Sequence, residues 1–181
     1  MPRAGGPAAP ETLQSPLALT PLTLIPGVIS AYMWKNVAIA LWFGPLSLAD
    51  VPAFEAGCKL NTEQHPEGVS MINIMVPGGK SLPTAEARQE LGRIMRDYQS
   101  SSAEVVVVIP GAGFWASAVR GLITALTMLA PRYRVHIAGS FLEVAEFLPS
   151  PHRARTGVEL DPKELLRALR WVESQGNAAA A

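Results

Sequence analysis

Three small residues, Gly111, Ala112 and Gly113, follow the β-branched run Val105–Ile109 and precede a predicted helix that begins near Trp115. Where such a turn meets the start of a helix, backbone N–H groups can converge on an anion. The segment is therefore a candidate anion-binding turn. Glycines at this place also allow a tight connection between strand and helix without any ligand, so the sequence leaves both interpretations open.

The same segment fits the pattern G-x-G-x-x-[GA], which marks a dinucleotide-binding turn when it follows a strand and opens a helix. The next predicted strand, Arg134–Ala138, is followed by Gly139 and Ser140 and not by the acidic residue that holds a ribose hydroxyl. Trp115 also places a bulky side chain where the phosphates would approach. Nucleotide binding is therefore an alternative only, and we expect no cofactor.

The predicted helix after the turn has two different faces. One face is apolar, and the other carries small and polar residues, namely Ser117, Arg120, Gly121, Thr124 and Thr127. Small side chains let a partner protein approach closely, with Arg120 as an anchor and Ser117 as a hydroxyl near the positive end of the helix dipole. Phe114 and Trp115 can add an aromatic anchor. The competing explanation is a solvated helix face, with the aromatic side chains in the core.

Other chemistry finds little support in the sequence. His65, His136 and His152 are scattered and lack the spacing or the cysteine partners of a metal site, so we expect no metal. Ser117 lacks the flanking glycines of the G-x-S-x-G motif, which argues against a hydrolase. The single cysteine, Cys58, excludes an internal disulfide. Because 15 Lys and Arg balance 15 Asp and Glu, we expect no nucleic-acid partner.

The elements that position these residues begin with a predicted hairpin. The β-rich runs Val28–Trp34 and Val37–Phe43 are joined by Lys35 and Asn36, and an asparagine tolerates the positive φ of a tight two-residue turn. The run Val105–Ile109 is apolar throughout, without alternating polar residues, which is typical of a strand buried on both faces in a parallel sheet. The hairpin and the buried run together predict a mixed sheet.

Strands and helices alternate after the hairpin. Further strands are predicted over Val69–Val76 and Arg134–Ala138. Periodicity and capping residues predict helices that start near Asp50, Thr84, Trp115, Ser140 and Asp161. We therefore expect an α/β sandwich with a mixed, mostly parallel sheet of about five strands, in the order β-β-α-β-α-β-α-β-α-α.

The two ends lie outside this pattern. Residues 1–25 lack periodicity and predict a flexible extension, residues 26–175 form one domain, and residues 176–181 form a flexible tail. Pro149–Gly157 is interpreted as a surface loop. No uninterrupted run reaches the ~20 apolar residues of a membrane span, which favours a cytoplasmic protein. A mean hydropathy of +0.20 favours self-association as a homodimer.

The order of elements, the strand–turn–helix over Val105–Leu129 and the late helix Phe141–Leu148 resemble the STAS-type fold of bacterial anti-sigma-factor antagonists, including variants related to lipid-binding SEC14 domains. The resemblance covers about Val28 to Val172. In that family a Ser or Thr that follows an Asp at the start of this helix is phosphorylated by a partner kinase. Ser117 is the matching position. The family motif Asp-Ser-Ser/Thr-Gly is replaced here by Ala116, Ser117, Ala118 and Val119, so the acid and the glycine that follows are both absent.

The resemblance implies a non-enzymatic signalling or scaffold domain. Its protein partner, of the kinase or regulator class, would dock on the turn and helix over Gly111–Thr124. The SEC14-related variants imply the alternative, a small-molecule or lipid-binding module with a cavity between the sheet and the helices.

Overall fold

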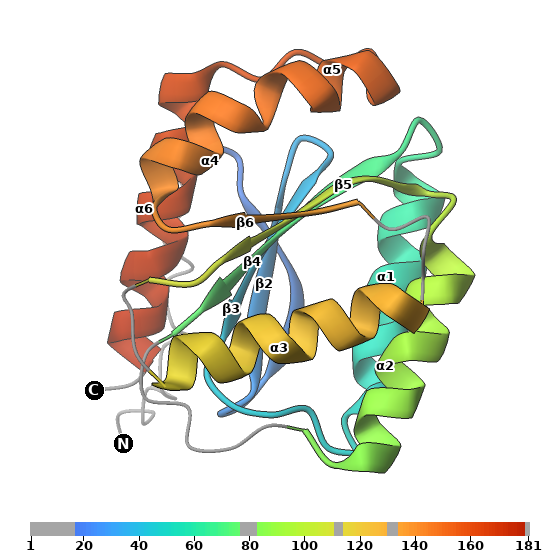
Figure 1. Ribbon diagram of the computed structural model, residues 1–181. Coiled ribbons are helices and arrows are strands. Elements are labelled where there is room, and N and C mark those ends of the chain that lie inside the picture. Colours follow the sequence, from blue (N-terminus) through green and yellow to red (C-terminus); the bar gives the residue numbers. More distant parts are fainter. Residues whose placement is uncertain (1–16, 77–82, 111–113, 130–133, 180–181) are drawn as a thin grey trace, which may run out of the picture.

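The computed structural model describes residues 17–76, 83–110, 114–129 and 134–179. It is an α/β sandwich in which one six-stranded sheet separates two layers of helices (Figure 1). The strands are β1 Thr20–Ile25, β2 Ile29–Trp34, β3 Val37–Trp42, β4 Val69–Met75, β5 Ser102–Val108 and β6 Val135–Ala138. The helices are α1 Val51–Gln64, α2 Ala85–Tyr98, α3 Phe114–Leu129, α4 Phe141–Phe147, α5 Pro149–Thr156 and α6 Pro162–Ala179.

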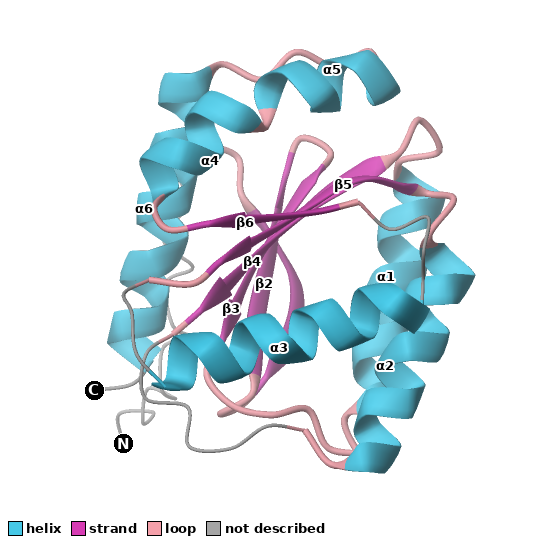
Figure 2. Ribbon diagram, viewed as in Figure 1, coloured by secondary structure: helices cyan, strands magenta, loops and turns pink. Residues whose placement is uncertain are grey.

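The strands lie in the sheet in the order of the chain, from β1 to β6. β1, β2 and β3 pair antiparallel, and β3, β4, β5 and β6 pair parallel, so the sheet is mixed as expected. α1, α2 and α3 connect the parallel strands and cover one face, while α4, α5 and α6 follow the last strand and cover the other (Figure 2). The C-terminal helices therefore form a separate layer.

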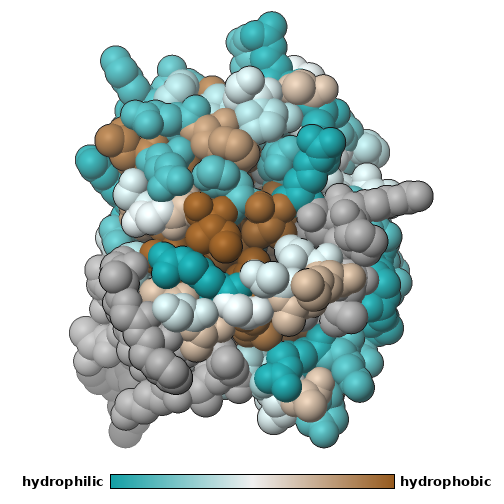
Figure 3. All heavy atoms as spheres, in the orientation of Figure 1, coloured by the Kyte–Doolittle hydropathy of each residue, from teal (hydrophilic) through white to brown (hydrophobic). Residues whose placement is uncertain are grey.

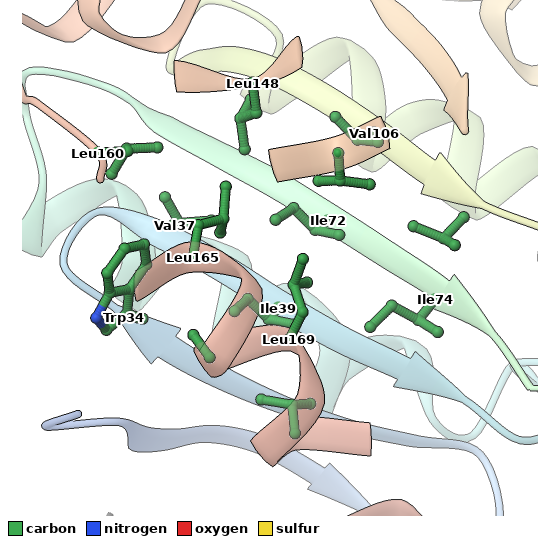
Figure 4. Close-up of a cluster of buried hydrophobic side chains, with 14 of the residues drawn as sticks. Trp34, Val37, Ile39, Ile72, Ile74, Val106, Leu148, Leu160, Leu165 and Leu169 are labelled. Carbon is green, nitrogen blue, oxygen red and sulfur yellow. The ribbon is translucent and has the colours of Figure 1, made fainter. Parts of the chain in front are cut away.

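The main core lies under this C-terminal layer. Val37 and Ile39 of β3 and Ile72 of β4 are fully buried there, against Leu165 and Leu169 of α6 (Figure 4). Because side chains alternate along a strand, the residues between them point to the opposite face. The second face is covered by α1–α3 and holds smaller apolar clusters.

The hairpin forms as predicted, with Trp34 opposite Val37 across a two-residue turn. The residue with positive φ is Lys35, at 52°, and not Asn36 as the sequence predicted. Asn36 is buried, and its side-chain amide donates to the carbonyl oxygen of Gly68 at 2.9 Å. The turn therefore uses asparagine as a buried anchor.

The sheet has one strand more than expected. Residues 1–25 were expected to be flexible, but Thr20–Ile25 forms β1 and pairs with β2. Pro21 is tolerated because β1 is an edge strand, where a missing N–H leaves no interior partner unpaired.

Two C-terminal predictions were also wrong. Pro149–Gly157 was expected to be a loop, but Pro149 occupies the first turn of α5, where its fixed φ suits a helix, and Gly157 ends that helix with φ of 75°. The expected flexible tail continues α6 to Ala179. Gly176 is buried there, and a Cβ atom at this position would lie 2.8 Å from Cδ1 of Leu41. Only glycine lets this end of α6 approach the sheet so closely.

A buried polar network ties α5 to the hairpin. The imidazole of His152 is fully buried between the hydroxyl of Ser70, 2.7 Å from Nδ1, and Oδ1 of Asn36, 2.9 Å from Nε2. The Asn36 amide nitrogen already donates to Gly68, so its oxygen faces the ring and Nε2 carries the hydrogen. Ser70 in turn donates to Nδ1. This arrangement suits a neutral histidine, and burial lowers the pKa of His152 to about 4.

The network predicts a loss of stability in acid. The unfolded chain takes up a proton on His152 near pH 6.5, whereas the native protein does so only near pH 4. The free energy of unfolding should therefore fall by about 2–3 kcal/mol between pH 7 and pH 4.5 through this group. Denaturant titrations of the wild type and His152→Gln at both pH values measure the difference, since the variant lacks this proton uptake. Equal losses in the two proteins would contradict the assignment.

Candidate functional site

The structure places the expected docking residues on the outer side of α3. Ser117 and Thr124 are exposed and Arg120 is partly exposed, while Ala116 and Val119 on the opposite side are buried against the sheet. The hydroxyl of Thr124 donates to the carbonyl oxygen of Arg120 at 2.9 Å. These residues share one accessible helix face, as the sequence predicted.

The rest of the expected corner is not described. Gly111, Ala112 and Gly113 lie outside the described residues. Phe114 and Trp115 open α3, but only their backbone is described. The anion-binding turn and the aromatic anchor therefore stay predictions.

A cavity of about 190 Å³ lies between the sheet and α1–α3. Its lining is mostly apolar and comes from β3, β4, β5 and all three helices of this layer. The lining includes Trp42, Cys58, Asn61, Met71, Asn73 and Val107.

Strand alternation explains which side chains of β4 line this hollow. Val69, Met71, Asn73 and Met75 are every second residue of β4, and all four line the cavity. The residues between them, represented by Ile72, point into the closely packed core under α6. Flexible and polar side chains thus occupy the cavity side of a strand whose other side is filled by branched apolar residues.

Helix α1 supplies one wall of the cavity. The sequence predicted a buried stripe of Val51, Phe54 and Cys58, and the next position on that stripe is Asn61. Asn61 is only 5% exposed. Burial raises the pKa of the Cys58 thiol to about 12, so this group stays protonated at neutral pH.

The two asparagines of the lining differ in their partners. Oδ1 of Asn73 accepts a hydrogen bond from Nε1 of Trp42 at 2.9 Å. Oδ1 of Asn61 is buried and has no hydrogen-bond partner. An unpaired buried acceptor costs about 1–3 kcal/mol of stability.

Charged side chains border this layer without entering the cavity. The guanidinium of Arg93 on α2 donates to both carboxylate oxygens of Glu55 on α1, at 2.7 and 2.9 Å, and to Glu90 and Asp97. These hydrogen bonds raise the pKa of Arg93, and they lower the pKa of Glu55. The cluster holds α1 against α2, while every described side chain that lines the cavity is uncharged.

The sequence reasoning did not identify Asn61 or Asn73 as site residues. Both positions nevertheless stand out in the sequence as polar residues within apolar patterns. Asn61 interrupts an apolar helix stripe, and Asn73 interrupts the apolar strand Val69–Val76. A polar residue in a buried pattern needs a partner, and these positions therefore marked either a hydrogen-bond network or a ligand site.

Other clusters in the described parts of the chain are structural. Ser70, His152 and Asn36 have the residue types of a hydrolytic triad, but all three are at most 2% exposed, so no substrate reaches them. His136 stacks on Phe147 with ring centroids 3.8 Å apart. Among the described residues, no group of three or more His, Cys, Asp or Glu side chains is arranged to hold a metal ion.

A second hollow, of about 250 Å³, lies on the α6 side at the carboxyl ends of the parallel strands, and exposed Gly139, Ser140 and Glu173 contribute to its lining. Apolar side chains also reach the surface over the edge strand β6, between α3 and α4, where Val135 and Ile137 are partly exposed (Figure 3).

The sequence matches no protein-family model and no curated protein. Within the described residues, no helix combines the length and the apolar character needed to cross a membrane.

A pair of neighbouring substitutions on β5 tests whether the cavity is open space. Val107 lines the cavity, whereas Val106 is fully buried in the core on the other face. Val107→Phe should raise the free energy of unfolding by about 1 kcal/mol, because the added ring fills unoccupied volume. Val106→Phe should lower it by about 1–3 kcal/mol through overpacking. Denaturant unfolding measures both, and similar destabilisation by the two variants would show that the cavity side is already filled.

Proposed function

We propose that this protein binds a small, mostly apolar molecule in the cavity between the sheet and α1–α3. The observation that carries the proposal is a hollow of about 190 Å³ whose described lining is uncharged and mostly apolar, with the buried Asn61 and Asn73 among the few polar side chains. Ligand sites in proteins have this composition, with apolar walls and a few placed polar groups.

The energetics support a ligand. Protein interiors are packed as densely as organic crystals, and voids larger than a water molecule are few. Side chains that line a hollow lack contacts that a filled core would supply. A bound molecule would supply those contacts.

The expected resemblance to SEC14-related variants of the STAS fold agrees with the proposal, because it implies a cavity between the sheet and the helices. The uncharged lining favours an apolar ligand over a nucleotide, since a phosphate needs cations or converging N–H groups. In this reading, the protein is a binding module and not an enzyme.

The ligand content of freshly purified protein tests the proposal. Native mass spectrometry and solvent extraction should find a bound apolar molecule on the wild type purified from its own cells. Val107→Phe should carry much less, because the new ring occupies the site. Wild-type protein free of ligand, or the same molecule at the same level on both proteins, would contradict cavity binding.

A second candidate function is docking of a protein partner on α3. It is supported by the exposure of Ser117 and Thr124, next to exposed Gly121 and Ala125, which would let a partner helix or strand approach closely. This is the surface expected for a STAS-like adaptor. A phosphate on Ser117 would lie in the first turns of α3, where the helix dipole favours negative charge.

Two substitutions on this face test docking. Ser117→Asp and Arg120→Ala should each weaken capture of the same partner by about tenfold while leaving the thermal unfolding midpoint within a few degrees of the wild type. A matched control is Arg170→Ala on α6, an exposed arginine in the other helical layer. Capture that is unchanged in both α3 variants would refute docking through this face.

A further inference from the structure

The sheet ends on β6, and among the described residues no strand pairs with the outer edge of this strand (Figure 1). The carbonyl oxygen of Arg134, just before β6, accepts a hydrogen bond from the N–H group of Val105 on β5 at 3.1 Å. Successive residues of a strand direct their backbone groups alternately to its two sides. The N–H and C=O groups of Val135 and Ile137 therefore face outward, away from β5.

The two edge strands of the sheet differ in how they are protected. Proline residues and bulges commonly block the edge of a sheet, where unpaired backbone groups could otherwise bind another strand. β1 has both features, since it contains Pro21 and an irregular register between Pro21 and Thr23. β6 pairs with β5 in continuous register, and its four residues, Val135–Ala138, include no proline. The edge of β6 is therefore open to a further strand.

Apolar side chains lie beside this edge. Val135 and Ile137 pack on the cluster under α3 and stay partly exposed (Figure 3). Leu142, in the first turn of α4, is 58% exposed. A strand added to β6 would remove part of this apolar surface from water, which favours pairing.

Opposite charges lie toward the two ends of the edge. Arg134 is exposed at the start of β6, and it lies on the α4 side of the sheet because it alternates in step with His136, whose ring stacks on α4. Glu143 of α4 lies on the same side, toward the end of β6. Its Oε2 accepts from the N–H group of Gly139 at 2.7 Å, and its Oε1 lies 3.3 Å from Nε2 of His136.

An antiparallel pairing of two copies about a twofold axis brings these charges together. With His136 opposite His136 of the second copy, Val135 and Ile137 form hydrogen-bonded pairs across the axis, with about four backbone hydrogen bonds in all. Arg134 of each copy then lies opposite Ala138 of the other, beside the carboxylate of Glu143. A parallel pairing would instead place like charges side by side, which is destabilising.

We infer that β6 pairs antiparallel with β6 of a second copy of this chain, so that two six-stranded sheets become one continuous sheet and Arg134 of each copy contacts Glu143 of the other. The sequence favoured a homodimer without indicating its interface, and the open edge with its opposite charges supplies one. Because β6 has only four residues, the dimer is weak and depends on concentration. The inference is independent of the proposed ligand.

Charge reversal tests the pairing by analytical ultracentrifugation over about 1–500 µM protein. The wild type should change from monomer to dimer within this range. Arg134→Glu and Glu143→Arg should each weaken dimerisation at least about tenfold, because like charges then meet at both contacts. An equal mixture of the two variants should form a heterodimer about as readily as the wild type dimerises, since both contacts again join opposite charges.

Two controls separate pairing from folding. Arg170→Glu reverses an exposed charge on α6, and it should dimerise as the wild type does. Glu143→Arg also removes the hydrogen bond to Gly139, so the thermal unfolding midpoint of each variant is measured as well. A variant that had merely lost its fold would form no heterodimer in the mixture.

A cysteine at the twofold axis tests the register. In a non-hydrogen-bonded antiparallel pair the two Cα atoms are about 4.5 Å apart, a distance that a disulfide spans. Mild oxidation should therefore link His136→Cys into a covalent dimer. Lys163→Cys, at an exposed position of α6, should stay unlinked under the same conditions.

Several results would overturn the inference. These are a wild type that stays monomeric over the whole range, charge-reversed variants that dimerise like the wild type, and a mixture that forms no heterodimer. A dimer in which His136→Cys links no better than Lys163→Cys would assemble through another surface, which also overturns it.

Discussion

The two faces of β4 and β5 pack differently against their helices, and the rest of the structure depends on this asymmetry. On one face, Ile72 and Val106 belong to the main core under α6. On the other, Met71, Asn73 and Val107 line a hollow under α1–α3. The main core fixes the strands against α6, and the hollow lies where the side chains of the other face leave space between the sheet and the helices.

Side-chain hydrogen bonds join the hairpin, β4 and α5 on the α6 side of the sheet. The amide nitrogen of Asn36 donates to the carbonyl oxygen of Gly68, just before β4, and its oxygen accepts from the ring of His152. The hydroxyl of Ser70 completes the chain of hydrogen bonds. These directional contacts hold α5, a helix of eight residues with a mostly polar sequence, against the sheet.

Much of the fold could be predicted from the sequence, because local patterns determine it. The hairpin, the buried strand around Val106 and the caps at Thr84, Ser140 and Asp161 were all confirmed, and each is a short-range signal. β1 and α5 were missed because prolines were interpreted as breakers, although an edge strand and a first helical turn both tolerate them. The site was harder to predict. The cavity forms where side chains from seven elements leave a space unfilled, and a local sequence pattern does not predict such a space.

Hydrostatic pressure acts on a protein through the empty space that unfolding eliminates. The space of about 190 Å³ between the sheet and α1–α3 is lost when the chain unfolds, so it contributes to the volume change of unfolding. The cavity therefore makes compressibility, and not only thermal stability, a property that occupancy would change. Filling it would leave the protein stiffer under compression while the packed face beneath α6 stays as it is.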